Sequence, residues 1–177
     1  ERTLLVGDSS GYLDAITGIP GVLATGITNR VPLGGGLFTG AFRSEEMAAA
    51  NVEAVRTSVR YVTPDYFEAM GARLVMGRTF LPEEGVDRVL LDEIATEHAW
   101  PGENPIGRRV EITTNGVEPV FAEVVGVVAP MKHEGVRQEA AQTVFLPMLA
   151  VANQQNSRYV AARVAGAPSD ISVTVSH

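Results

Sequence analysis

Cysteine is absent from this chain of 177 residues, which excludes disulfide bonds, thiolate zinc sites and cysteine nucleophiles. The lack of cysteine does not indicate a cellular compartment, because a cysteine-free chain is stable in oxidising and in reducing surroundings. No apolar run approaches the ~18–20 residues of a membrane-spanning helix, and no signal peptide opens the sequence. Because the sequence begins at Glu1 without an initiator methionine, we expect it to be a fragment of a longer protein.

Positive charge is scarce as well. The formal net charge is −7, and Arg108 and Arg109 form the only adjacent pair of basic residues. A chain without a basic stripe has nothing to follow a phosphate backbone, so nucleic acid is not an expected partner. The hydrophobic fraction of 45% and the charged fraction of 20% are typical of a folded protein, and the length suits one domain or two small lobes.

Catalytic motifs are also missing. The glycine loop 34–36 is followed by neither the lysine nor the helix start of a phosphate-binding loop, and no Gly-x-Ser-x-Gly elbow occurs. His98 shares a predicted helix with two glutamates but not with a second histidine at zinc-binding spacing, and nothing brings His133 or His177 to it. We therefore predict no catalytic, cofactor-binding or metal-ligating residue, no cofactor, and no enzymatic activity.

The acidic segment 81–87 carries carboxylates at Glu83, Glu84 and Asp87. Their spacing is not that of an EF-hand calcium loop. Adjacent carboxylates in a loop are usually solvated, so we interpret 81–87 as an exposed loop. We expect it and segment 104–108 to project from the domain, where substitutions would leave folding intact and could abolish function.

The stretch 61–80 organises the predicted fold. Thr63 is placed to cap a short helix with its hydroxyl, and Val62 and Phe67 occupy the positions of a hydrophobic staple. Gly71 then ends the helix in a left-handed conformation. The stretch therefore predicts an extended segment, a capped helix and a following strand.

Period-2 alternation and turn residues predict the rest of an α+β fold. The turn Asn115-Gly116 favours a hairpin whose second strand, apolar on both faces at its end, is central to a sheet. Helices are predicted within 1–19 and at 93–99, with a helical turn or linker at 45–52, and strands at 22–31, 55–61, 74–76, 88–92, 108–114, 117–128, 143–147 and 159–164.

Several segments resemble one known family in the same order. The stretch 61–80, YVTPDYFEAMGARLVMGRTF, resembles the v(S/T)PxYFexxGxxxxxGRxF signature of MacB-like periplasmic core domains. Further similarities are IPGV at 19–22, VPL at 31–33, VLLDE at 89–93, WPGENPIGR at 100–108, VVGVV at 124–128 and VFLP at 144–147.

The resemblance implies a two-lobed extracytoplasmic domain. A porter-like β-α-β lobe would comprise residues 1–61 and 150–177, and a small α/β-rich lobe, 62–149, would be inserted into it. Strands 55–61 and 159–164 are then expected to pair within one sheet. The implied function is that of the non-catalytic periplasmic domain of an ABC transporter permease of the FtsX-like type, which transmits conformational change or docks a partner or substrate during ATP-driven export.

The resemblance also implies the partners. They are the transmembrane helices of the same permease and its cytoplasmic ATPase, with a periplasmic adaptor protein as a further candidate. The parent would be a homodimer or heterodimer at the inner membrane, whereas the isolated domain is expected to be a monomer. The alternative is a free-standing ligand-binding or hydrolytic α/β domain.

Overall fold

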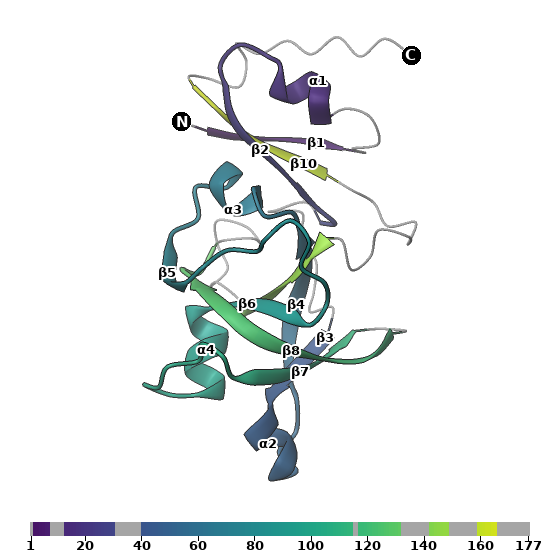
Figure 1. Ribbon diagram of the computed structural model, residues 1–177, viewed down its shortest axis with the longest axis vertical. Coiled ribbons are helices and arrows are strands. Elements are labelled where there is room, and N and C mark those ends of the chain that lie inside the picture. Colours follow the sequence, from purple (N-terminus) through teal and green to yellow (C-terminus); the bar gives the residue numbers. More distant parts are fainter. Residues whose placement is uncertain are drawn as a thin grey trace.

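The computed structural model describes residues 2–7, 13–30, 40–114, 117–131, 142–148 and 159–165, and these form an α+β fold (Figure 1). In chain order the elements are β1 (Arg2–Gly7), α1 (Leu13–Thr17), β2 (Val22–Thr28), β3 (Gly40–Ser44), α2 (Glu45–Ala49), β4 (Val55–Val62), α3 (Tyr66–Ala69), β5 (Leu74–Gly77), β6 (Arg88–Asp92), α4 (Glu93–Ala99), β7 (Arg109–Thr114), β8 (Val117–Val128), β9 (Thr143–Pro147) and β10 (Tyr159–Val164).

Six strands close on themselves to form a barrel. Their order is β4-β3-β7-β8-β6-β9, and β9 returns to β4 through parallel pairs running from Ser58 with Thr143 to Val62 with Pro147. β5 lies outside this circuit and pairs with β8. Closure leaves the six strands without a free edge along the circuit. We call these six strands the barrel.

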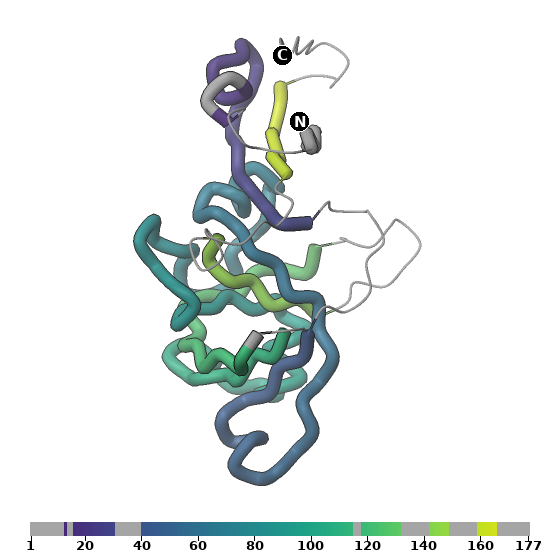
Figure 2. Tube along the Cα trace, turned by 90° about the vertical axis from the view of Figure 1, so that its right-hand side faces the viewer, coloured from purple at the N-terminus to yellow at the C-terminus, as the bar shows by residue number. Residues whose placement is uncertain are grey.

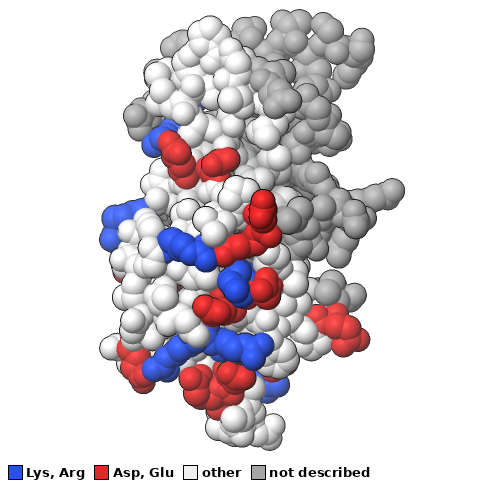
Figure 3. All heavy atoms as spheres, viewed as in Figure 1, with Lys and Arg blue, Asp and Glu red and all other residues white. Residues whose placement is uncertain are grey.

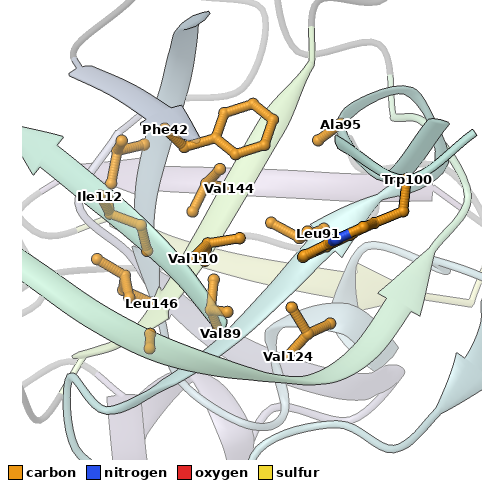
Figure 4. Packing of buried hydrophobic residues seen from close by; sticks show 12 residues of the cluster. Phe42, Val89, Leu91, Ala95, Trp100, Val110, Ile112, Val124, Val144 and Leu146 are labelled. Carbon is orange, nitrogen blue, oxygen red and sulfur yellow. The ribbon is translucent and has the colours of Figure 1, made fainter. Parts of the chain in front are cut away.

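Side chains from all six strands fill the barrel (Figure 4). Because side chains alternate along a strand, Val89 and Leu91 of β6 point inward while Leu90 joins a second cluster outside. Trp100, just after α4, is 3% exposed and packs on the same core. The buried members are Phe42, Val59, Val89, Leu91, Ala95, Trp100, Val110, Ile112, Ala122, Val124, Val144 and Leu146.

The terminal unit, defined as β1, α1, β2 and β10, extends the sheet beyond the barrel. β10 pairs antiparallel with both β1 and β2, and its Val160 and Ala162 bury Ile16 of α1. This unit lies at one end of the long axis and α2 at the other (Figures 1 and 2). β2 reaches the barrel through the pair Thr28–Val62.

The organising stretch forms an extended segment, a helix and a strand as predicted, but the helix starts differently. Val62 and Phe67 are buried in one cluster, and Gly71, with φ +64°, ends α3. The Gly71 N–H donates to the Glu68 carbonyl, and the Ala72 N–H donates to the Phe67 carbonyl. These two hydrogen bonds form a Schellman motif. The predicted cap and staple positions are wrong, because the N-cap of α3 is Asp65 rather than Thr63 and no side chain caps the helix. The Thr63 hydroxyl instead accepts a hydrogen bond from the N–H of Ile27.

Most predicted strands are confirmed, whereas two strands were missed. The helix predicted within 1–19 is α1, but residues 2–7 before it form β1, and residues 40–44 form β3. Both depend on partners far along the chain, Arg2 with Val164 and Gly40 with Thr114, which local patterns do not reveal. The predicted glycine loop 34–36 and the turn 115–116 lie outside the described residues.

The predicted relation between strands 55–61 and 159–164 is confirmed only at the level of the sheet. Both strands, β4 and β10, belong to one sheet, but β2 lies between them. The principal partners of β4 are β3 and β9, two strands of the barrel.

Candidate functional site

The described histidine, His98, is exposed and contacts one aromatic ring. It lies at the end of α4, and its ring meets the Phe42 ring edge-on at a centroid distance of 6.5 Å. Glu93, Ile94 and Glu97 line an open hollow beside it. Within the described part of the chain, no three His, Asp or Glu side chains are grouped as metal ligands would be. His133 and His177 lie outside the described residues.

Segment 81–87 is largely exposed, as predicted, but Glu84 is an anchored carboxylate rather than a solvated one. It accepts hydrogen bonds from both terminal nitrogens of Arg78, at 2.6 and 3.0 Å, and from the N–H of Leu81. The hydrogen bonds from Arg78 lower the pKa of Glu84. An acid held ionised in this way fixes the shape of the loop and is poorly suited to donate a proton.

Asp92 is the most deeply buried carboxyl among the described residues, at 1% exposure. One oxygen accepts a hydrogen bond from the Ala95 N–H and caps α4; the other accepts from the Thr143 N–H of β9, both at 2.8 Å. Burial raises the pKa of Asp92 to about 7, although these two hydrogen bonds act in the opposite direction and lower it. Sequence reasoning missed this residue, although an acidic residue directly before a predicted helix is a capping signal.

The segment 100–108, which carries the WPGENPIGR similarity, is bound to α2. The indole N–H of Trp100 donates to Glu46 at 3.1 Å. The Arg108 guanidinium lies 5.5 Å from the centre of the Trp100 ring and forms ion pairs with Glu46 and Glu103. This cluster fixes α2 at the end of the molecule opposite the terminal unit.

The expectation that segment 104–108 projects freely is therefore wrong in part. Asn104 is exposed, but Pro105 is buried and Ile106 packs against the core of the barrel. Substitutions at Pro105 and Ile106 are expected to disturb folding, because they remove core contacts.

Exposed apolar side chains concentrate in segment 74–86. Leu74 and Met76 of β5 are each 40% exposed, Leu81 is 54% exposed and Val86 is 38% exposed. Arg78 and Glu84 hold the segment between them in place. Basic and acidic side chains are interspersed on the face shown in Figure 3, without a patch of one sign. Segment 74–86 is thus the strongest candidate for a contact surface in the part of the chain that the structure describes.

Known structures share this fold. The periplasmic region of MacB from Actinobacillus actinomycetemcomitans has a TM-score of 0.60 at 16% identity, covering 92% of this chain and 74% of that one. The extracellular domain of the ABC-type transporter YknZ from Gram-positive bacteria also has a TM-score of 0.60 at 16% identity, covering 91% and 75%. A domain of a protein described as a permease, from Porphyromonas gingivalis, has a TM-score of 0.59 at 17% identity, covering 95% and 76%.

The fold is thus that of extracytoplasmic domains of transporter permeases. The family model for the MacB-like periplasmic core domain matches residues 10–175, and the chain belongs to this family. It is accordingly an extracytoplasmic domain of an ABC transporter permease. No curated protein is similar enough to this chain to count as a relative. In the described ranges, no helix has both the length and the apolar character needed to span a membrane.

Proposed function

We propose that this domain is a non-catalytic mechanical or docking module, which transmits conformational change or binds a partner or substrate while an ATPase drives export. The observation that carries the proposal is the family match over residues 10–175. The roles of the buried and anchored polar groups support it. Asp92 and Glu84 accept hydrogen bonds that hold local structure together, and Trp100 binds α2.

The proposal includes a division into two lobes. The predicted division puts residues 1–61 and 150–177 in a porter-like lobe and 62–149 in an inserted lobe. β3 pairs with β7, and β4 pairs with β9. These pairings support assigning β3 and β4 to the inserted lobe rather than to the porter-like lobe. The porter-like lobe would then correspond to the terminal unit and its connections.

Segment 74–86 is the proposed contact surface for a partner at the extracytoplasmic face of the membrane. Its exposed leucine, methionine and valine side chains supply apolar area, and the Arg78–Glu84 pair keeps the loop in one shape before binding. A segment that is already ordered loses less conformational entropy on binding.

Membership of the family supports two of the proposed partners, the transmembrane helices of the same permease and a cytoplasmic ATPase. We propose in addition a periplasmic adaptor protein as a candidate partner and a dimeric parent. The isolated chain is a monomer in this proposal, because it lacks the membrane contacts and its net charge of −7 opposes self-association at low salt.

The test is a full-length permease carrying Leu81→Ser and Val86→Ser together. We expect transport to fall while ATP hydrolysis and the folding of the isolated domain are retained. The matched control is Leu23→Ser, an apolar residue 47% exposed on β2, which should transport normally. Equal transport by both variants would remove segment 74–86 from the proposal.

Catalysis is tested separately on the isolated chain. We expect no turnover of generic ester, phosphate or peptide substrates and no saturable heat on titration with ATP, Zn²⁺ or Ca²⁺. Hydrolysis that disappears in His98→Ala would favour the alternative of a free-standing hydrolytic domain.

A further inference from the structure

The terminal unit and the barrel meet at a narrow junction (Figure 2). Among the residues that the structure describes, strand pairing joins them through one residue pair, Thr28 of β2 with Val62 of β4. One pair of residues fixes little of the relative orientation of two bodies. The contacts that α3 and its flanking residues add therefore decide whether the molecule bends at this point.

Hydrogen bonds extend the junction on both sides of that pair. The Thr63 N–H donates to the Ile27 carbonyl at 3.0 Å, and the Ile27 N–H donates back to the Thr63 hydroxyl at 2.8 Å. The Asn29 N–H donates to the Tyr61 carbonyl at 3.1 Å, and the Tyr61 N–H donates to the Asn29 side-chain oxygen at 3.0 Å. The side-chain oxygens of Thr63 and Asn29 thus extend the contact between β2 and β4 beyond the regular strand pairing.

The backbone of α3 lies directly on the backbone of β2. Gly26 is buried, and a Cβ atom added there would lie 2.4 Å from Cα and 2.6 Å from N of Tyr66, whereas ordinary contact begins at 3.4 Å. Both atoms belong to the main chain, so no side chain could turn aside to make room. The helix and the strand can meet this closely only because residue 26 is glycine.

Hydrophobic packing also spans the junction. Tyr66 and Phe67 of α3 share one buried cluster with Ala161 of the terminal unit and with Leu90 and Phe145 of the barrel. The Phe67 and Phe145 rings meet edge-on at a centroid distance of 5.2 Å. Densely packed interiors resist gradual deformation, so a joint filled in this way does not bend like a hinge.

An ion pair closes the outer side of the junction. Arg163 of β10 lies 3.2 Å from the Glu68 carboxylate of α3. Because Glu68 is largely exposed, this pair adds orientation more than stability.

We propose that α3 is a rigid coupling element that locks the terminal unit and the barrel into one body, with Gly26 as the residue that permits the lock. A displacement of the terminal unit then moves the α2 end of the molecule without being absorbed between them. This consequence for transport rests on the proposed function, whereas the rigidity belongs to the 177-residue chain and is measured on it alone.

The test uses the absence of cysteine, which lets two nitroxide labels be placed without background labelling. Leu23→Cys on β2 and Val52→Cys after α2 put labels on exposed positions at the two ends of the molecule. Pulsed electron paramagnetic resonance should give one narrow distance distribution between them. In Gly26→Ala, α3 must retreat from β2, and we expect the mean distance to shift and the single peak to be lost.

Two controls separate this effect from general disturbance. Gly85→Ala places a Cβ in ordinary contact, 3.5 Å from the Asp87 carboxylate, and should leave the distribution unchanged. The label pair Val52→Cys and Ile94→Cys reports on α2 and α4, which both adjoin the barrel, and should be insensitive to Gly26→Ala.

A Gly26→Ala chain that fails to fold would be replaced by Thr63→Val combined with Glu68→Gln. These changes remove the hydroxyl that accepts from Ile27 and the ion pair with Arg163, and we again expect the single peak to broaden. A broad or double distribution in the unsubstituted chain would overturn the proposal. An unchanged narrow peak in the substituted chains would overturn it as well, and neither result would bear on whether the domain serves a transporter.

Discussion

Asp92, the last residue of β6, joins two strands of the barrel to α4, and its removal should destabilise the fold more than that of any exposed carboxylate. Its oxygens accept from the N–H groups of Ala95 and Thr143. In Asp92→Ala, the loss of a helix cap costs about 0.5–2 kcal/mol. The Thr143 N–H, left unsatisfied in a residue only 2% exposed, adds roughly 1–3 kcal/mol. The free energy of unfolding should therefore fall by about 3 kcal/mol, within a range of roughly 1.5–5 kcal/mol.

The assay is urea denaturation followed by circular dichroism, with thermal unfolding alongside. For a chain of this size, a loss of about 3 kcal/mol corresponds to a drop in Tm of roughly 6–12 °C. Asp92→Ser keeps an oxygen for the Ala95 N–H and should recover about 1 kcal/mol. Asp87→Ala, at a carboxylate 64% exposed, should cost at most about 1 kcal/mol. If Asp92→Ala proved no worse than Asp87→Ala, the buried bridge between α4 and β9 would not contribute as described.

The same carboxyl should make stability depend on pH. Burial raises the pKa of Asp92 from 3.8 to about 7 in the folded chain. Between these values the folded chain holds a proton that the unfolded chain has released. The contribution to stability is therefore fully present below about pH 4 and is lost as the pH rises towards 7. From pH 5 to pH 8, the free energy of unfolding should fall more in the unsubstituted chain than in Asp92→Asn, and equal slopes would contradict the raised pKa.

Phe67→Ala should lower the free energy of unfolding by about 3–5 kcal/mol, because it opens a cavity among the aromatic rings around α3. Thr63→Ala should lower it by only about 1–3 kcal/mol, because it leaves the Ile27 N–H unsatisfied. A larger loss for Thr63→Ala than for Phe67→Ala in urea denaturation would contradict the packing argument. Trp100→Phe keeps an aromatic side chain but loses the hydrogen bond to Glu46 and part of the buried ring system, and a loss of at least about 1 kcal/mol is expected from the same assay. Sedimentation of the isolated chain at micromolar concentration should show a monomer, and a tight dimer would contradict the expected effect of its charge.

Local sequence signals determined much of the outline. Gly71 predicted the left-handed end of α3, because this feature depends on residues only a few positions apart. The hairpin strands β7 and β8 were found from alternation and an Asn-Gly turn for the same reason. Val62 and Phe67 were correctly predicted to pack together, although the helix starts later than a staple between them requires. The ordered motifs from 19–22 to 144–147 predicted the family, and the match over residues 10–175 confirmed it.

Tertiary structure alone decided how these pieces join. Closure of the barrel depends on parallel pairs such as Val59 with Val144, and the terminal unit depends on β1 meeting β10 at the far end of the chain. Thr63 had the composition of a helix cap, yet its hydroxyl serves Ile27 of β2. Gly26 showed no turn signal, and its role follows only from the backbone of α3 lying upon it. Each of these contacts joins residues that are distant in sequence, and a local pattern holds no information about which distant surface will cover it.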